Sequence, residues 1–442
     1  MNAPREEQPA AVAAAPQQAG DTLQEQWWWV ERTVWTDRML SALQSGAIKG
    51  GKWFRLIDKV YDQRNLTSAL FKVWSNKGSA GVDKQSVEDF AQKHASELAE
   101  LEQQIRTQSY RPYPVRRVYI DKPGSDQKRP LGIPAVRDRV VQTALRHVME
   151  PIFEREFAGH SYGFRPGRGC KDALRRVDEL LKAGATWVLD ADLKSYFDTI
   201  DHRRLLTLLQ ERIADGRVLE LVDAFLTQGV LEEIKGWQPT ESGTPQGAVI
   251  SPLLANIYLN GLDHKMAQAG YEMVRYADDF VILCQSRAQA QEALALVQGW
   301  VKEVALQLHE EKTKIVDATA AGGFEFLGYH FERGMKWPRQ KSISKLKDTL
   351  RATTRRTSGE SLSKIIERIN PVLRGWFGYF KHSKINSLMA LDGWVRMRLR
   401  SVLRKRLGRK GRGCGSDHQR WPNVYFNCAG LYSLESAWRR SS

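Results

Sequence analysis

The pattern of hydrophobic and polar positions changes at about residue 337, and the change divides the chain into two kinds of structure. Before this point, short segments with alternating apolar residues stand between segments with the helical spacing of three or four. Strands are predicted over 115–120 and 187–193, and a helix with one buried face from Val249 to Ile257. The segment 273–284 is predicted to form a hairpin with an Asp-Asp tip. This part of the chain is therefore predicted to have an α+β fold.

Beyond residue 337 only the helical period is found. One apolar stripe contains Ile343, Leu346 and Leu350, and a second runs from Leu362 to Phe380 with Pro371 as a kink or restart. A third helix is predicted from about Ser387 to Leu407. The region is therefore predicted to be all-helical.

The N-terminal part differs from both regions. Residues 1–22 are rich in Ala, Gln, Glu and Pro and are predicted to be disordered. Aromatic and amphipathic positions in 23–76 predict a helical extension with a break at Gly50-Gly51. The expected organisation is a tail (1–22), a helical extension (23–76), an α+β region (77–337), a helical region (338–407) and a basic C-terminal segment (408–442).

Charge points to an anionic partner. The 442 residues correspond to about three domains, and 67 Lys and Arg against 51 Asp and Glu give a net charge of +16. Nucleic acid is the first expected partner and an anionic membrane surface the second. No apolar run approaches the roughly 18 residues of a membrane span, and four widely spaced cysteines indicate neither a zinc ribbon nor a disulfide framework. We expect an intracellular protein of the cytoplasm, without a signal peptide or a membrane anchor.

The most basic tract lies between Arg396 and Arg420, where ten Lys or Arg stand against the single acid Asp417. Its Gly/Arg-rich part, 408–413, contains too little apolar material to pack, so we expect a mobile cationic arm. A solvated helix face is the alternative. We favour phosphate contacts of RNA, and the expected RNA-binding residues are Arg404, Lys405, Arg406, Arg409, Lys410 and Arg412.

Two clusters of acids carry the candidate chemistry. The strand period places Asp190 and Asp192 on one face of the predicted strand, while Asp278 and Asp279 lie at the hairpin tip. Either cluster alone is typical of a solvated turn or strand edge. Together they match the oxygen-rich sites that hold Mg²⁺, and two such ions can activate a hydroxyl and stabilise a leaving pyrophosphate.

A reaction of this kind also requires cations near the triphosphate. Lys122 and Arg129 lie on a predicted hairpin that could cover a nucleotide, although solvated loop charges are the alternative. The acids and the cations together indicate phosphodiester bond formation.

The order of the motifs resembles that of group II intron-encoded reverse transcriptases, also called maturases. The six matching blocks are 129–134, Tyr162-Gly163-Phe164-Arg165-Pro166-Gly167-Arg168-Gly169, 190–198, Thr244-Pro245-Gln246-Gly247, 276–279 and 323–329. The segment 373–380 is similar to the thumb and maturase region of the family. The resemblance implies a right-hand polymerase, with fingers and a palm made of an antiparallel sheet plus helices, then a helical thumb/maturase domain and a basic tail.

The resemblance also implies roles for individual residues. Asp192, Asp278 and Asp279 become the catalytic carboxylates, of which Asp192 and Asp278 bind two Mg²⁺ ions, with Mn²⁺ as a substitute; Asp190 becomes a neighbour. Phe197 selects deoxynucleotides, with core packing as the alternative. The expected nucleotide-binding residues are Lys122, Arg129, Phe197, Gln246 and Lys312, and the residues expected to hold the primer end are Gly328 and Tyr329.

Two residues depart from the family pattern: Ala248 follows Gly247 where a second glycine is common, and Asp121 stands where proline is frequent. The C-terminal endonuclease of many relatives is missing from the sequence, so second-strand cleavage is expected to come from elsewhere.

The main hypothesis is an RNA-directed DNA polymerase that binds group II intron RNA, assists its splicing and copies it from a primer at a DNA target. The expected partners are this or another RNA template, a DNA primer or target and deoxynucleotides. One alternative is a domesticated relative in phage defence, DNA repair or CRISPR spacer acquisition. The other is a non-catalytic RNA-binding splicing factor, which intact acids disfavour.

Overall fold

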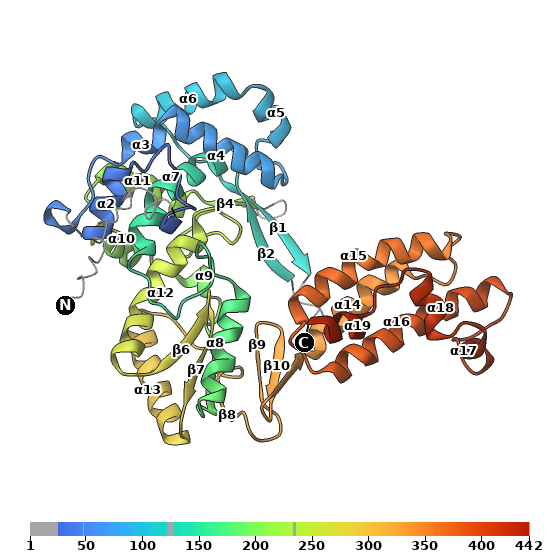
Figure 1. Ribbon diagram of the computed structural model, residues 1–442. Helices are drawn as coiled ribbons and strands as arrows, with labels where there is room; N and C mark the ends of the chain where they lie inside the picture. The colour runs from blue at the N-terminus through green and yellow to red at the C-terminus, as the bar shows by residue number, and fades with distance from the viewer. Residues whose placement is uncertain (1–24, 47, 122–127, 233–235, 442) are drawn as a thin grey trace, which may run out of the picture. The chain divides into compact units, whose positions relative to one another are not determined.

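The computed structural model describes residues 25–46, 48–121, 128–232 and 236–441, and Figure 1 shows the order of its elements. The chain folds into two compact units, each assembled from separate stretches of sequence. Of the described residues, the first combines those up to 118 with 132–156 and 202–257, and the second combines those of 119–131 with 157–201 and those from 258 onward.

The first unit is mainly helical and is built around α7 (Val136–Glu154), which is buried along most of its length. The indole Nε1 of Trp35 donates to the carbonyl of His147 at 2.9 Å, and the amide of Asn65 donates to the carbonyl of Ala144 at 3.1 Å. These bonds tie the N-terminal helices to α7. The helices of this unit also include α2 (Asp37–Ser45), the 3₁₀ turn η1 (Lys49–Gly51), α3 (Ile57–Tyr61), α4 (Gln63–Asn76), α5 (Val87–Gln92), α6 (His94–Arg106), α10 (His202–Gln210) and α11 (Gly216–Thr227).

A four-stranded sheet has the order β2-β1-β4-β5. Its strands β1 and β4 are parallel, with Val115 opposite Val230. The predicted strand over 115–120 is confirmed by β1. The bounds are β1 (Val115–Asp121), β2 (Lys128–Ile133), β4 (Val230–Glu232) and β5 (Gly236–Gln238).

The second unit contains an antiparallel sheet with the order β6-β7-β3-β8. Both of its faces are buried in the centre, because Val188 and Val281 as well as Leu189 and Ile282 are inaccessible to solvent. Helix α13 contacts β3, β7 and β8, while apolar residues of α8 pack with Val188 and Val281. The elements are β3 (Trp187–Asp192), β6 (Glu272–Tyr276), β7 (Asp279–Cys284), β8 (Lys314–Asp317), α8 (Cys170–Lys182), α9 (Tyr196–Thr199) and α13 (Arg287–Glu303). Helix α12 (Ser251–Gln268) begins in the first unit and belongs to the second from Tyr258 onward.

A second, three-stranded sheet is formed by β9 (Phe324–Phe326), β10 (Tyr329–Glu332) and β11 (Met335–Pro338). The rings of Phe324 and Phe331 stack with centroids 4.9 Å apart, and both join the apolar core that α8 shares with the larger sheet.

The helical region of this unit contains the long helices α14 (Gln340–Thr353), α15 (Leu362–Phe380) and α16 (Ile385–Arg406), which agree with the predicted stripes (Figure 1). Pro371 lies inside α15. Three short helices follow: α17 (Ser416–Arg420), α18 (Asn423–Cys428) and α19 (Leu434–Ser441). The α+β fold class with a helical C-terminal region is thus confirmed.

The C-terminal segment is fixed to α16 by two buried side chains. Arg400 donates to the carbonyl of Trp421 at 2.8 Å, and Asp392 accepts from the backbone amides of Leu434 and Glu435 at the start of α19. None of the described helices is both long enough and apolar enough to cross a bilayer.

Candidate active site

The register of the larger sheet brings together acids that are far apart in the sequence. Asp192 on β3 lies directly opposite Asp279 on β7, and Asp190 lies opposite Val281. Paired residues of antiparallel strands project to the same face, so Asp190, Asp192 and Asp279 share one face of the sheet. The convergence expected from the motif order is therefore present in the fold.

Asp278 lies in the turn beside this face. Tyr276 pairs with Asp279, which leaves Ala277 and Asp278 as a two-residue hairpin loop. Ala277 has a φ of +60°, as a type II′ turn requires at its first loop position. The predicted hairpin is confirmed, but only Asp278 lies at its tip, because Asp279 is the first residue of β7.

Burial raises the pKa values of Asp190, Asp278 and Asp279. The pKa of Asp279 is raised to about 7 by burial and by the charges of Asp190, Asp192 and Asp278. Burial also raises the pKa of Asp190 to about 6 and that of Asp278 above its ordinary value. The site therefore concentrates negative charge that lacks full compensation, which favours a bound cation.

Three basic residues offset part of this charge. Lys312 forms an ion pair with Asp192, and Lys314 Nζ lies 3.7 Å from Asp190 Oδ2. Arg129 on β2 lowers the pKa of Asp278 through its charge. The side chain of Lys312 is more than half exposed, so this ion pair is a weak one that a stronger cation can displace.

The donor chemistry of the site suits a hard divalent ion, because Mg²⁺ prefers carboxylate oxygens. Within the described ranges, no group of three or more His, Cys, Asp or Glu side chains is already arranged around a single metal position. One reason is that a carboxylate oxygen of Asp192 is already bonded to Lys312. The residues fit a metal in donor type and charge.

The predicted nucleotide-binding residues fall in different parts of the chain. Phe197 lies on α9 after β3, half-buried, with its ring 5.4 Å from that of Tyr196. Gln246 lies in a turn of the first unit, where its carbonyl accepts from Gly132 at 2.7 Å. Lys122 lies outside the described residues.

The two predicted primer-positioning residues differ in exposure. Tyr329 is 1% exposed, and its hydroxyl donates to the carbonyl of Tyr379 on α15 at 2.7 Å. Gly328, with a φ of +84°, forms a bend whose carbonyl accepts from the amide of Arg339 at 2.9 Å. The side chain of Tyr329 therefore belongs to the core, and Gly328 is the more accessible of the two.

The basic segment is more closely attached to the fold than its composition indicates. Arg404 pairs with the buried Asp417 at 2.6 Å, and the amide of Gly413 donates to Ser401 Oγ at 3.1 Å. A β-carbon on Gly413 would lie 2.6 Å from Cβ of Arg400, so the chain is tightly packed there. The expectation of an unpacked arm over 408–413 is wrong at this end, because Asp417 draws the segment back to α16. The exposed basic residues are Lys405, Arg406, Arg409, Lys410 and Arg412.

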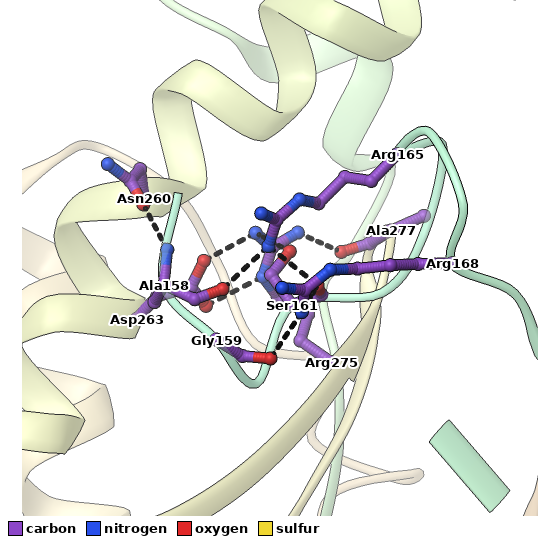
Figure 2. Close-up of polar contacts among 9 residues, drawn as sticks. All are labelled: Ala158, Gly159, Ser161, Arg165, Arg168, Asn260, Asp263, Arg275 and Ala277. Carbon is purple, nitrogen blue, oxygen red and sulfur yellow. Dashed lines mark hydrogen bonds and ion pairs between the residues drawn. The ribbon is translucent and has the colours of Figure 1, made fainter. Parts of the chain in front are cut away.

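Arg275, a completely buried arginine next to the acidic turn, has no part in the sequence-based predictions (Figure 2). The sequence feature that could have indicated its role is a charged residue between the apolar Val274 and the motif Tyr276–Asp279. Such a position requires a buried partner, which no local pattern identifies.

Comparison with known proteins gives two family matches. The model for "Reverse transcriptase (RNA-dependent DNA polymerase)" matches residues 120–331, and that for "Group II intron, maturase-specific domain" matches residues 343–421. The first match contains the acidic face and turn, and the second covers most of the helical region.

Curated relatives agree with these matches. The chain is 35% identical over 323 residues to protein YkfC of Escherichia coli (strain K12), which covers 63% of this chain and 83% of YkfC. It is 36% identical over 255 residues to group II intron-encoded protein LtrA of Lactococcus lactis subsp. cremoris, which covers 56% of this chain but 41% of LtrA.

Among solved structures, a chain of the partial Cas6-RT-Cas1–Cas2 complex overlaps 56% of this chain and 41% of its own length, with 24% identity and a TM-score of 0.36. The family assignment rests on the sequence matches. The chain has a reverse transcriptase domain followed by a maturase domain, and it spans most of a relative that is 35% identical to it. The protein is therefore a member of the group II intron reverse transcriptase and maturase family.

Proposed function

We propose that the chain is an RNA-directed DNA polymerase that adds deoxynucleotides to the 3′ end of a primer on an RNA template. The observation that carries this proposal is the pairing of Asp192 with Asp279, next to Asp278, on one half-buried acidic face. A polymerase of this class needs carboxylates that gather in this way.

In this proposal Asp192 and Asp278 hold two Mg²⁺ ions, for which Mn²⁺ can substitute, and Asp279 supports them. Such ions, when bound, favour the ionised form of the primer hydroxyl and neutralise charge on the phosphates. The raised pKa values of Asp278 and Asp279 support a cation-dependent site. Lys312, which pairs with Asp192, is proposed to assist protonation of the leaving pyrophosphate.

The incoming nucleotide is bound, in this proposal, by Lys122 and Arg129 through its phosphates, with Gln246 beside it. Phe197 lies on α9, the helix that follows β3 and its acid Asp192. From that place its ring is proposed to exclude a ribose 2′-hydroxyl and so to favour deoxynucleotides.

The primer end is proposed to be held by the bend that precedes β10. Gly328 would contact the primer through its backbone, because it is the more accessible of the two candidate residues. Tyr329 would support that bend from the core, where its hydroxyl is bonded to α15.

The RNA partner is proposed to be group II intron RNA, which the protein helps to splice and to copy at a DNA target. The match of residues 343–421 to the maturase-specific domain supports this partner. The residues proposed to contact its phosphates are the exposed Lys405, Arg406, Arg409, Lys410 and Arg412.

The test is extension of a DNA primer annealed to an RNA template, with Mg²⁺ and deoxynucleotides. The unmodified chain is expected to extend the primer, and Asp278→Asn to abolish extension while RNA binding persists. Asp317→Asn is a matched control, because it removes the same charge from β8 of the same sheet. Undiminished synthesis by Asp278→Asn would overturn the assignment, and no synthesis by the unmodified chain would favour a non-catalytic RNA-binding role.

A further inference from the structure

The guanidinium of Arg275 is completely buried and forms hydrogen bonds in three directions (Figure 2). Its Nε donates to Asp263 Oδ1 at 2.7 Å, and its Nη2 donates to the second oxygen of the same carboxylate. Nη2 also donates to Ser161 Oγ at 2.7 Å, and Nη1 donates to the carbonyl of Ala277 at 2.8 Å. One side chain therefore connects α12, the loop at Ser161 and the acidic turn.

Arg275 reaches the turn from the face of the sheet opposite to the acids. It pairs with Phe280, whereas the neighbouring pair is Tyr276 with Asp279. Since successive residues of a strand point to opposite faces, Arg275 lies on one side of the sheet and Asp279 on the other. Arg275 thus bonds to the turn from the far face, and its charge also lowers the pKa of Asp278.

The bond to Ala277 falls at the strained position of the turn. Ala277 has a φ of +60°, which a residue with a β-carbon rarely adopts unless its surroundings hold it there. Gly163 packs closely against the same residue, because a β-carbon at position 163 would lie 2.3 Å from the nitrogen of Ala277.

The loop that carries Ser161 and Gly163 is itself fixed to the sheet and to a second arginine. The amide of Arg275 donates to the carbonyl of His160, and the amide of Tyr162 donates to the carbonyl of Arg275. Arg165 donates to the carbonyls of Ala158 and Ser161 at 2.6 and 2.8 Å (Figure 2). The loop is therefore a firm support for the turn.

Stability alone does not account for this arrangement. A buried ion pair can often be replaced by apolar side chains without loss of stability. Packing of the core therefore does not by itself require Arg275 and Asp263. Charge neutralisation needs only the bonds to Asp263. The bond to the Ala277 carbonyl is additional and directs the arginine at the backbone next to Asp278.

We propose that Arg275, held by Asp263 and Ser161, is a positioning residue that fixes the Ala277 carbonyl and thereby sets where Asp278 and Asp279 lie relative to Asp192. The inference rests on the proposed polymerase function of these acids. Displacement of a reacting group by about 1 Å can cost on the order of a hundredfold in rate.

The test uses variants with separate effects on charge and on the carbonyl bond. Arg275→Met leaves Asp263 buried without its partner and is expected to lower the melting temperature. The double variant Arg275→Met with Asp263→Leu removes both charges and is expected to restore much of that stability. Arg275→Lys keeps a charge for Asp263 but lacks the planar fork that reaches all three partners. Arg176→Met, which breaks the exposed pair with Glu272 on the same strand, is the control.

The double variant and Arg275→Lys are expected to reduce kcat for primer extension by about 10- to 100-fold, with KM for deoxynucleotides within roughly threefold of the unmodified chain. Two results would overturn the positioning role. One is that kcat of the double variant recovers together with its melting temperature, and the other is that Arg275→Lys has the kcat of the unmodified chain.

A second readout does not depend on activity. Mg²⁺ is expected to raise the melting temperature of the unmodified chain by binding the acids, and this shift is expected to shrink in the double variant and in Arg275→Lys. An unchanged shift would overturn the inference. If the unmodified chain binds Mg²⁺ but does not extend a primer, the proposed function fails while the positioning role is still tested by the shift.

Discussion

Gly163 and Ala277 are in backbone contact, although they belong to separate motifs far apart in the sequence, and a β-carbon on Gly163 would lie 2.3 Å from the Ala277 nitrogen. This approach joins the motif Tyr162–Gly169 to the motif Tyr276–Asp279. The glycine in the first motif is therefore explained by packing against the turn in the second.

Gly163→Ala is accordingly expected to displace the acidic turn, because the clashing atoms belong to the backbone and cannot rotate away. We expect primer extension to fall by about a hundredfold or more. Gly159→Ala is the matched control, since nothing lies within 4 Å of a β-carbon at that position. Equal activities of the two variants would contradict the role given to this approach.

The raised pKa values of Asp190 and Asp279 predict a pH dependence of stability without divalent ions. Their folded values, about 6 and about 7, lie above the value of about 3.9 for an unfolded aspartate. The fold thus favours the protonated acids. This contribution to stability is fully present below the unfolded pKa of about 4 and is lost progressively as pH rises from there through 6 to 7. Melting temperature in chelator is expected to fall over this range, and to fall less in Asp279→Asn. Parallel profiles would count against the burial of Asp279.

Phe197→Ala tests the proposed sugar discrimination. Removal of the ring is expected to raise incorporation of ribonucleotides relative to deoxynucleotides, while deoxynucleotide incorporation persists. The measurement is the ratio of the two kcat/KM values. No change in this ratio would make Phe197 a packing residue against Tyr196.

Neutralisation of Lys405, Arg409, Lys410 and Arg412 tests the proposed RNA binding. Each phosphate interaction that is removed is expected to reduce the slope of log affinity against log salt by roughly 0.7 to 0.9. The measurement is RNA binding as a function of salt concentration. An unchanged slope would mean that these side chains face solvent in the complex.

Arg404→Met is expected to behave differently from these variants. Because Arg404 pairs with the buried Asp417, its replacement leaves that carboxylate without its charged partner and should lower the melting temperature. Lys405→Met is the control on the same helix. Equal melting temperatures would show that the Arg404–Asp417 pair is dispensable.

Local patterns account for what could be predicted from the sequence. The alternation in 187–193 is sufficient to identify β3, because the strand period is visible in the residue types themselves. The hairpin is identified by its short apolar segments on both sides of the acidic turn. The pairing of Asp192 with Asp279 is a long-range contact, and only the order of motifs indicated it.

Long-range partners account for what could not be predicted. The composition around Arg404 suggests a solvated arm, since nothing near it in sequence shows that Asp417 folds back. Tyr329 lies in a motif, yet its burial depends on α15, about 50 residues later. Arg275 is only a charge within a strand until Asp263 is placed beside it.

The junction between β10 and α15 has a mechanical consequence. The hydroxyl of Tyr329 donates to the carbonyl of Tyr379, and the hydroxyl of Tyr379 donates to the carbonyl of Leu327, each at 2.7 Å. Two reciprocal hydrogen bonds restrain both translation and rotation of α15 relative to β10, whereas a single bond would still allow rotation about it. We therefore expect the C-terminal end of α15 and the bend at Gly328 to move as one rigid body. Any movement of the long helices during synthesis would then require a conformational change at another point of the chain.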